Sequence, residues 1–346
     1  MIMNDINKVL SYVTFMYKCK YIITSIHPQD KDSIDWSKVK NIVWQGTCKV
    51  DGFPPKYGEV RSFVNRQAVI LETFENNDYI FCDRLQWDML NLFKKEDLKE
   101  KVLFLGGAEA DFVPTNLVRL AGLYDFKHYF VTGKAFPHYK VDCLPWGFSI
   151  ELSRTGDWLN IDDVYSYLSK LDVNTKTENL WTGCRKHDNE DDTTSIRIKC
   201  LKRSGVYDST HFYKRDITKG AEDSSTGDFL AYPEFLQKLA TVRFTLIPNS
   251  STLCVAVGDG PGIWESLYCN TIPIMPSWII WKDFQKIFPI ITVDDWSEVN
   301  PSNLTQTRYE DIMAQYGGDE WRKYLDLDYF FEHYVKGCLG NTNGTQ

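Results

Sequence analysis

Short apolar runs alternate with amphipathic segments through the first 150 residues or so of the chain. Apolar runs of strand length, rich in branched and aromatic side chains, cover residues 39–44, 78–82, 101–105 and 128–132. The amphipathic segments between them predict helices over residues 61–74, 86–93 and 114–123. Strands that alternate with helices predict a parallel sheet that is covered by helices on both faces.

A second alternating unit follows a break in this pattern. The break begins at Leu144-Pro145-Trp146-Gly147 and continues as a mostly polar stretch over residues 154–176. Beyond it we expect strands over residues 179–182, 244–247, 271–275 and 289–293, and helices over residues 194–202, 229–240, 262–269 and 308–335. The chain is therefore predicted to be α/β, with an N-terminal domain over residues 1–155, a linker over 156–177, a second domain over 178–305 and a helical C-terminal segment with a tail over 306–346.

Composition narrows the class of protein and of partner. A length of 346 residues suits two domains of ordinary size. The net charge of −8 lacks the basic footprint of a nucleic-acid-binding protein, so no nucleic-acid partner is expected. The nine cysteines are odd in number and form no C-x-x-C pair, which favours free thiols over disulfides or a metal site. With no apolar stretch of membrane-spanning length and no signal-peptide pattern, we expect a cytoplasmic protein without a membrane span.

The segment over residues 244–276 carries the most chemical information. It reads as strand, loop, helix and strand, and the loop begins at Pro248 and Asn249 and ends in Gly258-Asp259-Gly260-Pro261-Gly262. Parallel sheets bind ligands beyond the carboxyl ends of their strands, and glycines at a helix start let the backbone N–H groups approach an anion. A diphosphate suits that place, and Glu265, within the first predicted turn, could accept both hydroxyls of a ribose. A plain βαβ unit in which Glu265 interacts favourably with the helix dipole explains the same residues.

This segment resembles the exostosin-like glycosyltransferases. The family pattern is an aromatic strand ending in Pro, a Gly-containing loop, an aromatic residue next to Glu on a helix, and Ile-Pro-Val or Ile-Pro-Ile on the next strand. The matching residues are Phe244, Leu246, Pro248, Gly258, Gly260, Trp264, Glu265 and Thr271-Ile272-Pro273-Ile274. The resemblance covers the second half of the chain. It implies two Rossmann-like domains facing a cleft (the GT-B fold), a C-terminal helix returning toward the N-terminal domain, and Glu265 on the ribose of the donor.

Two details qualify the resemblance. The family carries an Arg that helps to hold the donor phosphates three residues before the Glu. This chain has Gly262 there, so transfer requires another basic residue in that role. Many relatives are anchored in the Golgi membrane, whereas this chain resembles the soluble members found in large algal viruses.

Candidates for phosphate binding and for proton transfer follow other predicted strands. Arg185 ends the strand near residue 182 and is suited to bidentate phosphate contact, although it also fits a solvated basic turn. The base that deprotonates an acceptor hydroxyl is expected from the N-terminal domain, where Asp83, Glu109 and Asp111 follow strands. Each of these acids also fits a helix cap or an ion pair. Asp51 and the loop residue His138 are weaker candidates.

The sequence therefore predicts transfer of a monosaccharide from a UDP-sugar or GDP-sugar to a hydroxyl of an oligosaccharide or a glycoprotein glycan. We expect an inverting reaction with a carboxylate base and neither a metal nor a cofactor. One alternative is a metal-dependent GT-A-type transferase that uses Glu109-Ala110-Asp111, with Asp30-Lys31-Asp32 and Asp326-Leu327-Asp328 as further D-x-D sequences. The other is a non-catalytic protein that binds a nucleotide-sugar or a carbohydrate, for which Gly262 is the best support.

Overall fold

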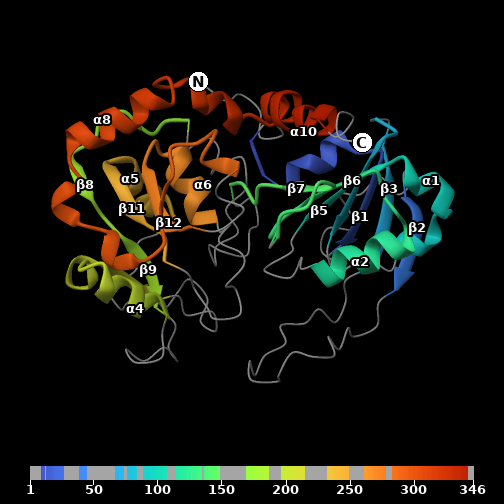
Figure 1. Ribbon diagram of the computed structural model, residues 1–346, viewed down its shortest axis with the longest axis horizontal. Helices are drawn as coiled ribbons and strands as arrows, with labels where there is room; N and C mark the ends of the chain where they lie inside the picture. The colour runs from blue at the N-terminus through green and yellow to red at the C-terminus, as the bar shows by residue number, and fades with distance from the viewer. Residues whose placement is uncertain are drawn as a thin grey trace.

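The structure is a computed structural model in which the strands form two main sheets. It describes residues 9–11, 13–26, 39–44, 67–73, 76–83, 89–106, 114–134, 136–148, 169–186, 196–214, 232–248, 261–277 and 283–341. We refer to residues 9–148 as the N-terminal half, to residues 169–304 as the C-terminal half and to residues 305–341 as the C-terminal segment. Figure 1 shows one sheet in each half and the helices of the C-terminal segment running across both.

The sheet of the N-terminal half has the strand order β2-β3-β1-β4-β5-β6-β7. Its strands are β1 (Tyr21–Ile26), β2 (Val39–Trp44), β3 (Gln67–Glu72), β4 (Tyr79–Asp83), β5 (Val102–Gly106), β6 (His128–Val131) and β7 (Val141–Cys143). From β1 to β7 through β4, β5 and β6 all pairs are parallel, whereas β3 pairs antiparallel with both β1 and β2. The α/β class is confirmed, but the expectation of a purely parallel first sheet was wrong.

The correction comes from residues 61–74, for which the sequence predicted a helix. The structure places β3 there, with Ile70 fully buried and opposite Ile23 of β1. The four apolar residues 68–71 form a continuous run, which suits a strand buried on both faces as well as it suits a helix. Pairing with β1 on one side and β2 on the other makes this segment a strand, and the local sequence does not predict that pairing.

Apolar residues on both faces hold the N-terminal sheet in place. On β5 every residue is buried: Val102 and Phe104 join the core beneath the C-terminal segment, whereas Leu103 and Leu105 join the core beneath α2 (Pro114–Leu123). This alternation is the pattern of a strand covered on both faces. The helix α1 (Lys95–Lys99) precedes β5.

The sheet of the C-terminal half is parallel throughout and has the strand order β13-β12-β11-β8. Its strands are β8 (Glu178–Leu180), β11 (Val242–Leu246), β12 (Ile272–Pro276) and β13 (Ile291–Val293). The helix α5 (Tyr232–Ala240) leads into β11, and α6 (Pro261–Tyr268) connects β11 with β12. The helix α8 (Gln306–Gln315) packs on this sheet through Tyr309, whose ring meets Phe244 edge-to-face at 6.0 Å.

A smaller parallel pair continues from β8. After Trp181 and Thr182 the chain forms β9 (Gly183–Lys186), which pairs with β10 (His211–Lys214), and α4 (Ile196–Arg203) lies between them in the sequence. The buried Trp181 ring lies so close to Gly183 that a Cβ there would be 2.4 Å from it. The glycine at the start of β9 is therefore required by the packing of Trp181.

The C-terminal segment packs against the N-terminal sheet through aromatic rings. It continues from α8 through η12 (Glu320–Leu325), α9 (Leu327–Phe330), η13 (Phe331–Val335) and α10 (Lys336–Asn341). The Phe331 ring meets Tyr79 edge-to-face at 5.1 Å and lies 6.2 Å from Phe104 and 6.5 Å from Phe15. Aromatic pairs of this kind stabilise beyond the area they bury. One continuous apolar core thereby includes residues of both halves and of the C-terminal segment. Among the described residues no helix is long and apolar enough to cross a membrane.

The N-terminal residues 9–11 form a seam between the halves. Val9 bridges to Asp326, and Ser11 bridges to Gly147. The Leu10 N–H lies 2.9 Å from both Leu325 O and the Tyr268 hydroxyl oxygen, while Leu10 O accepts from Phe148 N. The seam therefore connects the last residues of the N-terminal half to α6 and to the C-terminal segment.

Gly147 is the tightest point of the seam and provides a test of it. Its φ is +72°, and a Cβ there would lie 2.2 Å from Leu10 O. We expect Gly147→Ala to lower the free energy of unfolding by about 3 kcal/mol or more, measured by urea denaturation, because the seam must separate. The matched control is Gly318→Ala, where φ is +67° but the space is open, and there a loss of about 1 kcal/mol is expected. Equal losses at the two positions would contradict the seam.

Candidate functional site

The carboxyl edge of the C-terminal sheet is the candidate site. Because its four strands are parallel, their carboxyl ends meet at one edge. Leu246 ends β11 there and is followed by Ile247 and the half-buried Pro248. A Cβ built on Gly262 would lie 3.6 Å from Ile247 Cδ1, so the start of α6 adjoins the end of β11. Pro261, which has no N–H group, is the first residue of α6, and the next N–H groups of this helix are at the sheet edge.

Glu265 is the fifth residue of α6, so it begins the second turn rather than lying in the first turn as predicted. Its side chain is 4% exposed, which is unusual for a carboxylate. One turn later, the Cys269 thiol donates to Leu236 O of α5, which places this face of α6 toward α5. Burial raises the pKa of Cys269 to about 12, and the nearby Glu265 carboxylate adds to that rise. Since the effect of the helix dipole falls off within the first turn, the dipole explains Glu265 poorly.

Trp264, the aromatic residue of the family pattern, is part of the hydrophobic core. It is fully buried, and its ring meets Phe284 and Phe288 edge-to-face at 5.5 and 5.3 Å. These contacts fix the rotation of α6 and with it the direction of Glu265. The Ser266 hydroxyl donates to Gly262 O at 2.6 Å and further secures the first turn.

Asn270 and Thr271, of which Thr271 belongs to the family pattern, follow the last residue of α6. Asn270 has a φ of +58°, its N–H donates to Leu267 O, and Thr271 N donates to Ser266 O at 2.8 Å. This is the Schellman arrangement, in which Asn or Gly is favoured because other side chains are strained at positive φ. The residue types at these two positions are therefore explained by the way the helix ends, without a ligand.

Lys176, at the end of the predicted linker, secures the opposite edge of the sheet. Its ammonium donates to Ala240 O and Cys269 O, both at 2.7 Å, and to Thr271 Oγ1 at 3.3 Å. The two carbonyls lie at the ends of α5 and α6, where a cation is favourable to the helix dipole. Burial lowers the pKa of Lys176 to about 7, although the nearby Cys269 acts to raise this pKa.

Lys176→Met tests this role. The variant leaves two buried carbonyls without their donor, so we expect a loss of about 2–3 kcal/mol in the free energy of unfolding, with little change in the exposed control Lys199→Met.

The folded pKa of about 7 for Lys176 lies below the unfolded value of 10.5, so the unfolded chain binds one more proton than the folded chain between these pH values. The stability of the native protein relative to the variant should therefore rise with pH in that window. A flat or falling difference would contradict the assignment.

The structure brings some of the predicted site residues together. Pro248 and Gly262 lie at the carboxyl edge described above, whereas Glu265 lies one turn further along α6, on the same face as Cys269, which contacts α5. Arg185 lies on β9 opposite Tyr213, and Asp83 is the last residue of β4 opposite Gly106 of β5; the side chains of Arg185 and Asp83 are outside the described part. The remaining predicted residues also lie outside it: Asp51, Glu109, Asp111, Asn249, Gly258 and Gly260.

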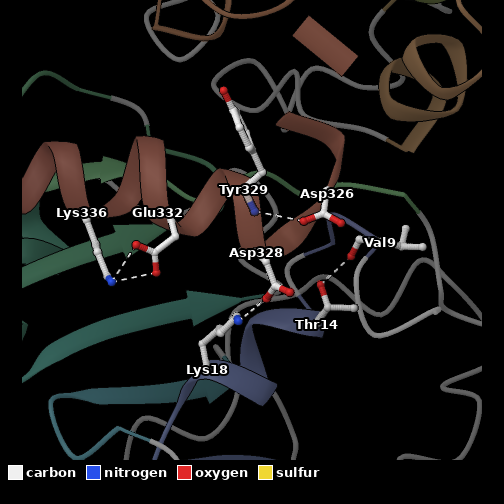
Figure 2. A network of polar contacts seen from close by, with 8 residues as sticks. All are labelled: Val9, Thr14, Lys18, Asp326, Asp328, Tyr329, Glu332 and Lys336. Atoms are coloured by element: carbon white, nitrogen blue, oxygen red, sulfur yellow. Dashed lines mark hydrogen bonds and ion pairs between the residues drawn. The ribbon is translucent and has the colours of Figure 1, made fainter. Parts of the chain in front are cut away.

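The described D-x-D sequence has a structural role (Figure 2). Asp326 accepts from Tyr329 N at 3.0 Å and so caps α9, and Asp328 pairs with Lys18 of the N-terminal half. Each of the two carboxylates therefore has a partner within the protein. Within the described ranges no group of three or more His, Cys, Asp or Glu side chains is placed to hold a metal ion.

A polar cluster that the sequence did not indicate lies on β6 and β7. The buried His128 is hydrogen-bonded through Nε2 to Asp142 Oδ2 at 3.0 Å, and Lys134 Nζ lies 3.8 Å from Asp142 Oδ1 and 3.8 Å from Asp283 Oδ2. Burial acts to raise the pKa of Asp142, but the bond to His128 and the charge of Lys134 outweigh it and lower the pKa. No local signal finds this cluster, because Asp283 is far from the others in sequence.

His138, a weaker candidate, is fixed by its own loop. Its Nδ1 accepts from Lys140 N at 3.1 Å, and its ring stacks on Tyr139 at 4.7 Å. Burial, followed by the charge of Lys140, lowers the pKa of His138. The residue therefore orders the connection between β6 and β7.

Comparison with known proteins does not assign the chain to a family. No protein-family model matches the chain, and a search of the curated proteins finds no match. The geometry of the sheet edge and the motif around Glu265 are therefore the features from which a function can be inferred.

Proposed function

We propose that the chain is a glycosyltransferase that takes a monosaccharide from a nucleoside-diphosphate donor. The observation that carries the proposal is the buried Glu265 on a helix that starts at the carboxyl edge of a parallel sheet. Ligands of such sheets bind at this edge. The resemblance to exostosin-like glycosyltransferases adds the expectation of a ribose next to the carboxylate.

In this proposal the donor lies across the ends of β8 and β11. The N–H groups of the first turn of α6 receive the diphosphate, because a helix start favours negative charge. β9 continues the chain beyond the carboxyl end of β8, so the backbone of Arg185 is at the same edge, from which its guanidinium could contact a phosphate.

The acceptor hydroxyl is deprotonated by a carboxylate of the N-terminal half. Asp83, Glu109 and Asp111 remain the candidates, and Asp83 ends a strand directly beside Gly106. The hydroxyl oxygen forms a bond to the anomeric carbon, and the bond from that carbon to the diphosphate breaks. The electron pair goes to the departing diphosphate, whose charge the N–H groups of α6 stabilise. The donor would carry UDP or GDP, and the acceptor would be a sugar hydroxyl of a glycan.

Gly262 favours a second function, namely a protein that binds a nucleotide-sugar without transferring the sugar. The resemblance implies an Arg at this position, and glycine offers no charge to stabilise the leaving diphosphate. The two functions differ in turnover and share the same donor site.

Glu265→Gln tests the shared donor site. The variant keeps the shape of the side chain and removes the charge that would accept both ribose hydroxyls, so we expect nucleotide affinity to fall about tenfold or more. Affinity is measured by calorimetry, after thermal shifts with UDP, GDP, ADP and their sugars have identified the ligand. Glu96→Gln, at an exposed position of α1, is the control and should bind as the native protein does. Unchanged affinity in a folded Glu265→Gln variant would exclude Glu265 from the site.

Gly262→Arg tests the diphosphate position and separates the two functions. A side chain fits here because a Cβ makes an ordinary contact with Ile247. We expect donor affinity to rise about tenfold through a charge-assisted bond to phosphate. Gly262→Ala is the control: it should raise helix stability by about 0.5–1 kcal/mol without changing affinity. Equal affinities of the Arg and Ala variants would place the phosphates elsewhere, and sugar transfer by the Arg variant alone would identify the native chain as a binding protein.

A further inference from the structure

A buried lysine lies between the two halves of the molecule. Lys134 follows β6 after a turn in which Gly133 has a φ of +74°, and it is 5% exposed. Its ammonium is 3.8 Å from Asp142 Oδ1, on β7 of the N-terminal half, and 3.8 Å from Asp283 Oδ2, in the C-terminal half. The lysine is therefore shared equally between a carboxylate of its own half and one of the other half.

Lys134 and Asp283, which form the contact between the halves, each have a second oppositely charged residue nearby. Asp283 Oδ1 is 3.4 Å from Lys286 Nζ, three residues along the same half. Lys134 retains Asp142, which is itself held by His128 at 3.0 Å. Separating Lys134 from Asp283 would therefore leave neither charge alone, which removes the main cost of breaking a buried ion pair.

This ion pair has a distinct place in the fold. Among the ion pairs of the described residues, Lys134–Asp283 is the one that joins the N-terminal half directly to the C-terminal half. Next to it, Phe284 packs on Tyr334 of the C-terminal segment at 6.1 Å, and Tyr334 packs on Phe330 at 4.7 Å. These apolar contacts do not need the ion pair and can act as a pivot beside it.

We propose that Lys134 and Asp283 form a reversible latch between the halves. In the closed state Lys134 is shared by Asp142 and Asp283. In the open state Lys134 stays with Asp142, and Asp283 stays with Lys286. The latch is a property of the fold and does not depend on the proposed sugar transfer.

The two lysines that contact Asp283 should have opposite effects, which makes the latch testable. Lys134→Met and Asp283→Asn remove a contact of the closed state, so they should raise the ratio of open to closed molecules at least threefold. Lys286 contacts Asp283 in both states, but in the closed state it also repels the nearby Lys134 ammonium. Lys286→Met removes that repulsion only from the closed state, so it should lower this ratio, by less because Lys286 is exposed. The exposed control Lys199→Met should leave the ratio unchanged.

The ratio is measured on the full chain by single-molecule energy transfer. Dyes are attached through non-canonical amino acids at Val118 of α2 and Asp311 of α8, which are both exposed and lie on helices that pack on different sheets. Circular dichroism establishes that each variant is folded, and Asp283→Asn carries the test if Lys134→Met does not fold. Opposite shifts for the two lysine variants support the latch. Shifts in the same direction, or a single distance that no variant changes, overturn it.

Discussion

Parallel pairing of β11 with both β8 and β12 is the constraint on which the candidate site depends. It sets Phe244 opposite Leu180 on one side and opposite Ile272 on the other, so the chain must leave β11 at the same edge at which β8 and β12 end. The return through α6 then places the first turn of that helix beside Ile247. Packing of Trp264 between Phe284 and Phe288 fixes how α6 is rotated, and this rotation directs Glu265. The position of the carboxylate thus follows from backbone pairing and aromatic packing.

The C-terminal segment connects this site to the rest of the molecule. Tyr309 packs on the C-terminal sheet, whereas Phe331 packs on the N-terminal sheet, so one stretch of chain contacts both (Figure 1). The seam at Leu10 and Gly147 adds hydrogen bonds between the halves, and Lys134 adds an ion pair. The apolar contacts join the halves through one continuous core, while the ion pair is the contact whose partners have alternatives. A candidate base of one half and a donor bound to the other would meet through this arrangement.

Local sequence patterns correctly predicted those helices and strands whose bounds are set by neighbouring residues in the chain. The helix Pro114–Leu123 and the strand Val39–Trp44 have the predicted bounds: the helix begins at a proline, and the strand is a short segment that ends in Ile-Val-Trp. Residues 68–71 form a continuous apolar run, and pairing with β1 makes them a strand. At the site, the strand, loop and helix pattern was sufficient to bring Pro248 and Gly262 to one edge, whereas Glu265 lies in the second turn of α6, and its contact with a ribose stays a prediction. Which of Asp83, Glu109 and Asp111 faces a donor depends on how the halves are oriented, and contacts between distant residues such as Lys134 and Asp283 determine that orientation.

Backbone hydrogen exchange with and without a nucleotide-sugar tests the central claim most directly, because it locates the ligand without changing the chain. If the donor binds at the carboxyl edge of the C-terminal sheet, saturation with the UDP-sugar or GDP-sugar that binds should slow exchange in the first turn of α6, at residues 262–264, and in β9. Exchange in α8, which packs elsewhere on the same sheet, should not change. Protection confined to the N-terminal sheet, or none in α6 at saturation, would contradict the account.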